Sequence, residues 1–149
     1  MKEFVIRDGL IVYSFKGETL WECEASDIIC FAEYTDVNGP YADDYFFVFI
    51  TRNSDQLFDL YTASFYSEGR DALLDYLGEL WGFEVRLGLV DSTDWKSRVL
   101  YPQRLADQSF YEFREVRETE FLKRLKSWFV PTVEMFFSDE VKNLLRGLA

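Results

Sequence analysis

Residues 57–82 read LFDLYTASFYSEGRDALLDYLGELWG, and the spacing of the apolar residues changes within this stretch. Leu57–Phe65 is a short run rich in aromatic and β-favouring residues, which predicts a strand. From Gly69 to Trp81 the apolar residues recur instead at helical spacing, and Gly82 is placed to end that helix. They are Leu73, Leu74, Leu77, Leu80 and Trp81. The stretch therefore predicts a strand followed by an amphipathic helix that packs on a sheet.

Five more apolar runs precede this stretch, and turn signals such as Asp8-Gly9 separate them. Within Thr19–Glu24, the pair Trp21 and Cys23 alternates with two glutamates, which is typical of a half-buried strand. The five runs are Phe4–Arg7, Leu10–Lys16, Thr19–Glu24, Ile28–Asp36 and Asp44–Thr51. Short strands joined by short turns predict an α+β fold with one strongly curved antiparallel sheet of six to seven strands.

The rest of the chain predicts two short extended pieces, a strand or turn, and two helices. The extended pieces are Val85–Val90 and Ser97–Tyr101, and Phe110–Phe113 is the strand or turn. Phe121–Phe129 has a helical stripe that stops before Pro131, and a last helix starts at Ser138. We therefore expect an α+β domain over residues 1–113, with residues 114–149 as a helical extension packed on it.

The chain contains no histidine, but it has 15 Phe, 9 Tyr and 4 Trp. Histidine is the commonest general base and metal ligand, so its absence argues against an enzyme and against a zinc site. Cys23 and Cys30 form no CxxC pair and are expected to be buried, free thiols. We expect no cofactor and no metal. An enzyme that uses Asp or Glu alone remains the minor alternative.

Acidic residues dominate the first half of the chain. The net charge is −11, and residues 1–75 hold 15 acids against 5 bases. Such a surface repels nucleic acid and anionic membranes and attracts basic partners, although acidity also serves plain solubility. No apolar run reaches the roughly 20 residues that span a bilayer, and residues 1–8 carry charges where a signal peptide would need an apolar stretch, so we expect no signal peptide. These features predict a soluble cytoplasmic protein.

Three local clusters could carry chemistry, and each has a simpler explanation. Asp36, Asp43 and Asp44 could hold a cation, but without EF-hand spacing they are expected to be solvated loop acids. Glu22, Glu24 and Glu33 could share a sheet face as paired carboxylates, yet alternation explains the first two as the wet side of a strand. The segment 95–98, WKSR, joins an aromatic ring to two bases, a combination that can bind single-stranded nucleic acid. It is expected instead to be a packed tryptophan beside surface bases.

Two groups of motifs resemble a known family. Trp21 followed by Asp27–Asp36 (DIICFAEYTD) is similar to its opening pattern, and Asp94–Pro102 with Ser109–Glu112 is similar to its ending. The family comprises small uncharacterised bacterial proteins with a pleckstrin-homology-like half barrel, of the toxin-immunity type. The resemblance covers residues 19–113, lacks the lysine expected at position 34 or 35, and supplies no catalytic residues. It implies a half barrel and an immunity role.

Together these observations predict a non-catalytic cytoplasmic binding protein, with an immunity role that occludes a basic toxin domain. The expected docking surface is acidic and aromatic, because charge steers association while rings slow release. Its residues are Tyr34, Asp36, Tyr41, Asp43, Asp44 and Tyr45. The alternative is a pleckstrin-like module that binds a peptide or a lipid. The sequence leaves the oligomeric state open.

Overall fold

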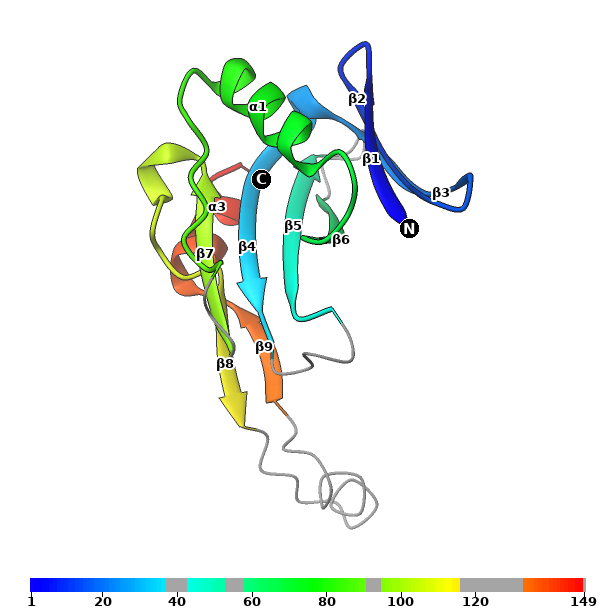
Figure 1. The fold of residues 1–149 in the computed structure, drawn as a ribbon. Coiled ribbons are helices and arrows are strands. Elements are labelled where there is room, and N and C mark those ends of the chain that lie inside the picture. Colours follow the sequence, from blue (N-terminus) through cyan, green and yellow to red (C-terminus); the bar gives the residue numbers. More distant parts are fainter. Residues whose placement is uncertain (37–42, 53–57, 91–94, 116–132, 149) are drawn as a thin grey trace, which may run out of the picture.

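The computed structural model describes residues 1–36, 43–52, 58–90, 95–115 and 133–148, and it has an α+β fold (Figure 1). Sheet A contains β1 (Lys2–Arg7), β2 (Leu10–Phe15) and β3 (Glu18–Glu24) in that order. Sheet B has the order β6-β5-β4-β7, with β4 (Ile28–Thr35), β5 (Tyr45–Arg52), β6 (Phe58–Ser64) and β7 (Lys96–Tyr101). A third pair joins β8 (Tyr111–Glu115) to β9 (Val133–Phe137), and the helices are α1 (Arg70–Trp81) and α3 (Asp139–Leu148).

The expected α+β class is confirmed, but the expectation of one continuous curved sheet is wrong. The described strands form separate open sheets, and β3 does not pair with β4. Between them lies a short 3-10 turn, η1 (Ala25–Asp27), in which the Ala25 N–H donates a 2.9 Å hydrogen bond to the Gly9 carbonyl oxygen. This bond fixes the turn to the hairpin of β1 and β2, and β4 begins sheet B directly after the turn.

The hairpins of sheet A follow the sequence closely. Asp8 and Gly9 have φ values of 50° and 84°, the left-handed pair of a type I′ turn, whose twist matches the flanking strands. The next turn lies at Lys16 and Gly17, one residue earlier than expected. Cys23 is buried, whereas Glu22 and Glu24 are exposed, as the alternation predicts.

Sheet B is covered on both faces, which explains why all of β4 is buried or nearly so. One face packs with sheet A and α1 around Phe31, Phe47 and Phe49. The opposite face packs against α3 through Val141 and Leu144. Side chains that alternate along β4 therefore all enter an interior, and polar residues of this strand must find partners there.

Helix α1 begins at a close contact with sheet A. Its N-cap is Gly69, with φ of 77°, and a Cβ at this position would collide with the Phe4 carbonyl oxygen. No side-chain hydrogen bond caps the start of the helix, not even from the nearby Ser67. The Ser67 hydroxyl instead shares a 2.9 Å hydrogen bond with the Tyr13 hydroxyl. At the other end Gly82, with φ of 78°, caps the helix as expected.

The C-terminal part differs from expectation in two places. Strand β9 was not predicted, and Val85–Val90 forms no strand, because its backbone is held by side chains in place of a neighbouring strand. The predicted helix start at Ser138 is confirmed, since its Oγ accepts a 3.3 Å hydrogen bond from the Val141 N–H. The predicted helix at Phe121–Phe129 lies outside the described residues.

Candidate functional site

The two strand tyrosines predicted to anchor a partner lie inside the protein, on opposite faces of sheet B. Tyr34 is 8% exposed, and its ring lies 5.1 Å from that of Phe46 and 5.3 Å from that of Tyr111. Tyr45 is 2% exposed and stacks on Phe65 at 4.2 Å. Burial raises the pKa of Tyr34 to about 12 and also raises the pKa of Tyr45. Neither ring presents a surface in this structure.

The acidic members of the predicted surface divide between interior and exterior. Asp36 is buried, and its N–H donates a 2.9 Å hydrogen bond to the Asp44 carbonyl oxygen. Asp43 and Asp44 are half-exposed, and the exposed Tyr66 donates a 2.6 Å hydrogen bond to Asp44 Oδ1, which raises the pKa of Tyr66 to about 12. Tyr41 lies outside the described residues. Docking at these positions stays a prediction, and Asp43 and Asp44 are its accessible described members.

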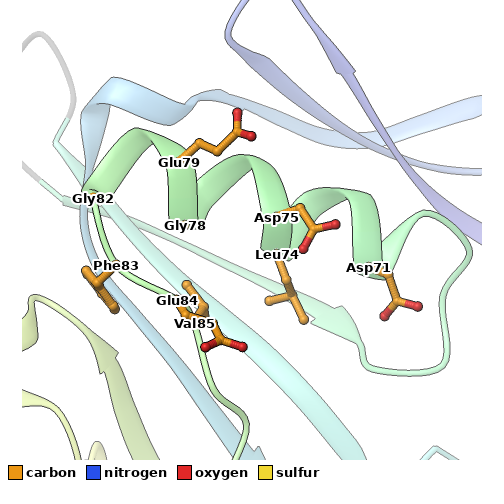
Figure 2. Close-up of a pocket in the computed structure, with 9 residues that line it drawn as sticks. All are labelled: Asp71, Leu74, Asp75, Gly78, Glu79, Gly82, Phe83, Glu84 and Val85. Atoms are coloured by element: carbon orange, nitrogen blue, oxygen red, sulfur yellow. The ribbon is translucent and has the colours of Figure 1, made fainter.

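A groove of about 610 Å³ runs beside α1, between the helix and the segment that follows it (Figure 2). The helix forms one wall, and residues 83–85 form the other. The lining residues are Asp71, Leu74, Asp75, Gly78, Glu79, Gly82, Phe83, Glu84 and Val85. The groove is therefore built from a single stretch of chain that turns back on itself at Gly82. We call it the acidic groove.

Four of the nine residues that line the acidic groove carry a carboxylate, and none is a base. Asp71 and Asp75 lie one helical turn apart on one wall, and Glu84 projects from the other wall (Figure 2). Asp71 pairs with its neighbour Arg70 at 3.1 Å. Glu84 pairs with Arg86, also at 3.1 Å, but both of those side chains are largely exposed. Such exposed pairs contribute little and exchange readily for others.

Two carboxylates of the helix are not engaged. Among the described residues, neither Asp75 nor Glu79 forms an ion pair with a base. The Glu79 carboxylate points toward the side of the helix opposite Phe83 (Figure 2), whereas Asp75 stands on the groove side. Like charges spaced i,i+4 on a helix destabilise it by a few tenths of a kcal/mol, so a cation bound beside Asp71 and Asp75 would relieve a repulsion.

The floor of the acidic groove is apolar and closely packed. A Cβ at Gly78 would lie 2.9 Å from the Phe83 carbonyl oxygen, so the glycine lets the second wall approach the helix. The Phe83 ring is near-parallel to the Trp81 and Tyr101 rings, which stack on each other at 4.0 Å. Leu74 and Val85 complete the apolar lining. Apolar side chains that line a groove together with carboxylates suit a cationic side chain with an aliphatic stem.

A second hollow, of about 330 Å³, extends the acidic surface toward Asp44. It is lined by residues 66–72 and shares Asp71 with the acidic groove. Tyr66 lines this hollow and also hydrogen-bonds Asp44, so the accessible end of the predicted docking surface adjoins the groove. We call the groove and this hollow together the acidic band. Its carboxylates are those of Asp44, Glu68, Asp71, Asp75 and Glu84, and the hollow also contains one base, Arg70, which pairs with Asp71.

A buried carboxylate lies behind the second wall of the groove. Glu33 is fully buried, with Oε2 accepting a 2.8 Å hydrogen bond from the Tyr45 hydroxyl and Oε1 a 2.7 Å bond from the Gly88 N–H. Arg98 Nη1 lies 3.6 Å from Oε1. Burial raises the pKa of Glu33, although hydrogen bonds from Tyr45 and from the backbone of Gly88 and Leu89, together with the Arg98 charge, act to lower it. Glu33 is buried in sheet B, whereas Glu22 and Glu24 are exposed on sheet A, so the three carboxylates do not share a sheet face.

One wall of the acidic groove could have been predicted from the spacing of acidic residues along the helix, which the spacing of apolar residues does not reveal. Asp71, Asp75 and Glu79 recur every fourth residue along the predicted helix, and such a spacing could have been recognised as an unneutralised acidic stripe. The opposite wall has no comparable signal. Nothing local in Phe83–Val85 shows that this piece returns against the helix.

In the described part of the chain, no group of three or more acidic or cysteine side chains could hold a metal ion. None of its helices is both long enough and apolar enough to cross a membrane. Comparison of the chain with family models, with curated proteins and with solved structures gave no match in any of the three. The resemblance to pleckstrin-homology-like proteins therefore stays a prediction.

Proposed function

We propose that this protein is a non-catalytic binding protein whose acidic band docks a basic segment of another protein. The observation that carries the proposal is the acidic groove, where the helix wall and the opposite wall both present carboxylates over an apolar floor, with no base in the lining. A lysine or arginine side chain would place its charge between Asp75 and Glu84 and its stem against Phe83.

The charge of the whole chain supports a basic protein as the partner. With a net charge of −11, the long-range field attracts cations and repels nucleic acid and anionic lipid. A zwitterionic or anionic headgroup would set its phosphate against the carboxylates of the acidic band. We therefore propose a polypeptide over a lipid, and binding to anionic vesicles would contradict this choice.

The resemblance of residues 19–113 narrows the proposed role to immunity, in which the protein occludes a basic toxin domain. Two free, buried thiols suit a reducing compartment, which supports action in the cytoplasm. The absence of histidine from the chain supports a role by occlusion over catalysis. Occlusion needs only a complementary surface, with aromatic anchors and charges of the correct sign.

A charge-reversal experiment tests the proposal. A fluorescent oligo-arginine peptide is titrated with wild-type protein and with the double variant Asp75→Lys/Glu84→Lys, which reverses one charge on each wall. The variant replaces two attractions between peptide arginines and carboxylates by two repulsions between arginine and lysine. Binding should therefore weaken by about tenfold or more. The slope of log Kd against log salt should also become shallower.

The matched control is Glu22→Lys/Glu24→Lys, which makes the same change in net charge at exposed positions of β3. It should retain most of the affinity, because it leaves the acidic groove intact. If the two double variants weaken peptide binding equally, the affinity depends only on the net charge of the protein. That result would contradict binding in the acidic groove.

A further inference from the structure

The second wall of the acidic groove belongs to a segment without helix or strand. Residues 83–90 leave α1 at Gly82 and run along the molecule toward β7. Phe83–Val85 line the groove, and Leu89 is buried in the core beneath sheet A and α1. The first residue of this segment is tied to α1 by a 3.1 Å hydrogen bond from the Phe83 N–H to the Gly78 carbonyl oxygen. Beyond Phe83 no described strand pairs with this segment, so side chains that reach it from elsewhere help to hold it. We call residues 83–90 the strap.

One anchor of the strap is the carboxylate of Glu33 on β4. The Gly88 N–H donates to Glu33 Oε1 at 2.7 Å, and the Tyr45 hydroxyl donates to Oε2 at 2.8 Å. Because Glu33 is fully buried, bulk solvent does not reach these oxygens. A hydrophobic side chain at position 33 could fill the same volume, but it could not accept the Gly88 N–H.

Arg98 on β7 supplies the second anchor. Its Nη1 donates a 2.7 Å hydrogen bond to the Arg86 carbonyl oxygen, and its Nε donates to Asp107 Oδ1 at 2.5 Å. A Cβ at Gly88 would lie 2.8 Å from the same Nη1, so the missing side chain makes room for the guanidinium under the strap. Arg98 thus contacts the strap on one side and Asp107 on the other.

We infer that Glu33 is a positioning residue for the acidic groove: through Gly88 it seats the strap, and the seated strap fixes the distance between the two walls. Residues 83–85 lie between the Phe83 N–H bond to Gly78 and the two anchors, so a strap released at Gly88 would lose one of its attachments and the wall that carries Glu84 would loosen. A wall already in place spares a ligand the cost of ordering it. The effect on binding rests on the proposed function, whereas the seating of the strap does not.

Hydrogen exchange in the absence of any ligand tests the seating. Glu33→Leu introduces an apolar side chain of similar size and removes the oxygen that accepts the Gly88 N–H. Glu33→Gln keeps an acceptor oxygen and removes the charge. Amide exchange of Gly88 and Leu89 should accelerate by about tenfold or more in Glu33→Leu, the change that one lost hydrogen bond produces. Exchange in the middle of β5 should change much less, and Glu33→Gln should stay close to wild type.

Gly88→Ala is a second variant, in case Glu33→Leu fails to fold. This glycine is exposed, so the added methyl presses on Arg98 without entering the core. Exchange within the strap should accelerate while the thermal midpoint changes little. Strap exchange equal to wild type in the folded variants, or faster exchange spread evenly over the whole chain, would overturn the inference.

Binding of the oligo-arginine peptide gives the functional readout. Glu33→Leu and Gly88→Ala should weaken it several-fold, whereas Glu33→Gln should not, which separates seating of the strap from loss of one negative charge. If wild-type protein fails to bind the peptide but the exchange pattern holds, the proposed function fails and the role of Glu33 stands. If Glu33→Gln weakens binding as much as Glu33→Leu, charge and not seating sets the affinity.

Discussion

The indole N–H of Trp21 on β3 donates a 2.9 Å hydrogen bond to the carbonyl oxygen of Thr62 on β6. Two residues along β6, the N–H of Ser64 donates to the hydroxyl of Tyr13 on β2 at 3.0 Å. Side chains of sheet A thus form hydrogen bonds with backbone groups of β6, at the edge of sheet B where a neighbouring strand would otherwise pair. This arrangement explains how two separate sheets share one core, and it places the stability of their junction on a few polar groups.

Replacing Tyr13 by Phe should destabilise the protein by about 1–3 kcal/mol, because the buried N–H of Ser64 and the hydroxyl of Ser67 lose their partner. Urea denaturation measures the change. Tyr66→Phe is the control, since it removes a hydroxyl from an exposed ring and should change the free energy of unfolding by less than about 0.5 kcal/mol. Similar losses in the two variants would contradict a special role for Tyr13.

Replacing Gly69 by Ala should be much more damaging than replacing Gly17 by Ala. Both glycines have φ near 80°, so each substitution carries the left-handed cost of about 1–2 kcal/mol. Only at position 69 would the new methyl also meet the Phe4 carbonyl oxygen, whereas position 17 is open. Overpacking should add about 1–3 kcal/mol at position 69, measured by thermal or urea unfolding. Equal losses would show that α1 can move away from β1.

The buried Glu33 should make the fold relatively more stable at low pH. Burial raises its folded-state pKa above the unfolded value, so its contribution is complete below the unfolded pKa and is lost as pH rises through the folded pKa. The other carboxylates titrate in the same range, so Glu33→Gln is the reference. The free energy of unfolding of wild type minus that of Glu33→Gln should fall as pH rises above about 4. An increase over that range would contradict the raised pKa.

Cys23 and Cys30 should resist alkylation in the native protein. Burial raises the pKa of each thiol to about 12, and at Cys23 Asp27 and Glu24 add to the effect. Because the thiolate is the nucleophile, iodoacetamide at mildly alkaline pH should label neither thiol until urea unfolds the chain. Mass spectrometry counts the added groups. Rapid labelling of Cys30 without denaturant would show that the face of sheet B covered by α3 opens readily.

Reversing the charges of Asp43 and Asp44 to Lys should weaken binding of the oligo-arginine peptide and flatten its salt dependence. Asp44 adjoins the acidic groove through Tyr66, so a basic partner that follows the acidic band reaches this corner. The measurement is the salt titration used for Asp75→Lys/Glu84→Lys. Unchanged affinity together with an unchanged salt slope would show that docking at the Asp36–Tyr45 segment was wrongly predicted.

Local pattern was sufficient for much of the fold. Alternation identified the strands of sheet A, the change of period located α1 within one residue, and Ser138 marked the start of α3. These features depend on neighbours in the chain, whose spacing decides which side chains share a face. By contrast, β9 and the strap carry no periodicity, because their positions depend on β8 and on Glu33.

The sequence by itself determined the α+β class, the turns of sheet A, the amphipathic helix and the excess of negative charge. Only the tertiary structure decided that Tyr34 and Tyr45 are core residues and that Asp75 and Glu84 line one groove from opposite walls. The reason is that alternation shows which residues share a face of a strand, but not whether another layer covers that face. Sheet B is covered on both sides, so rings that looked like surface anchors became interior packing, and the open carboxylates are found beside α1.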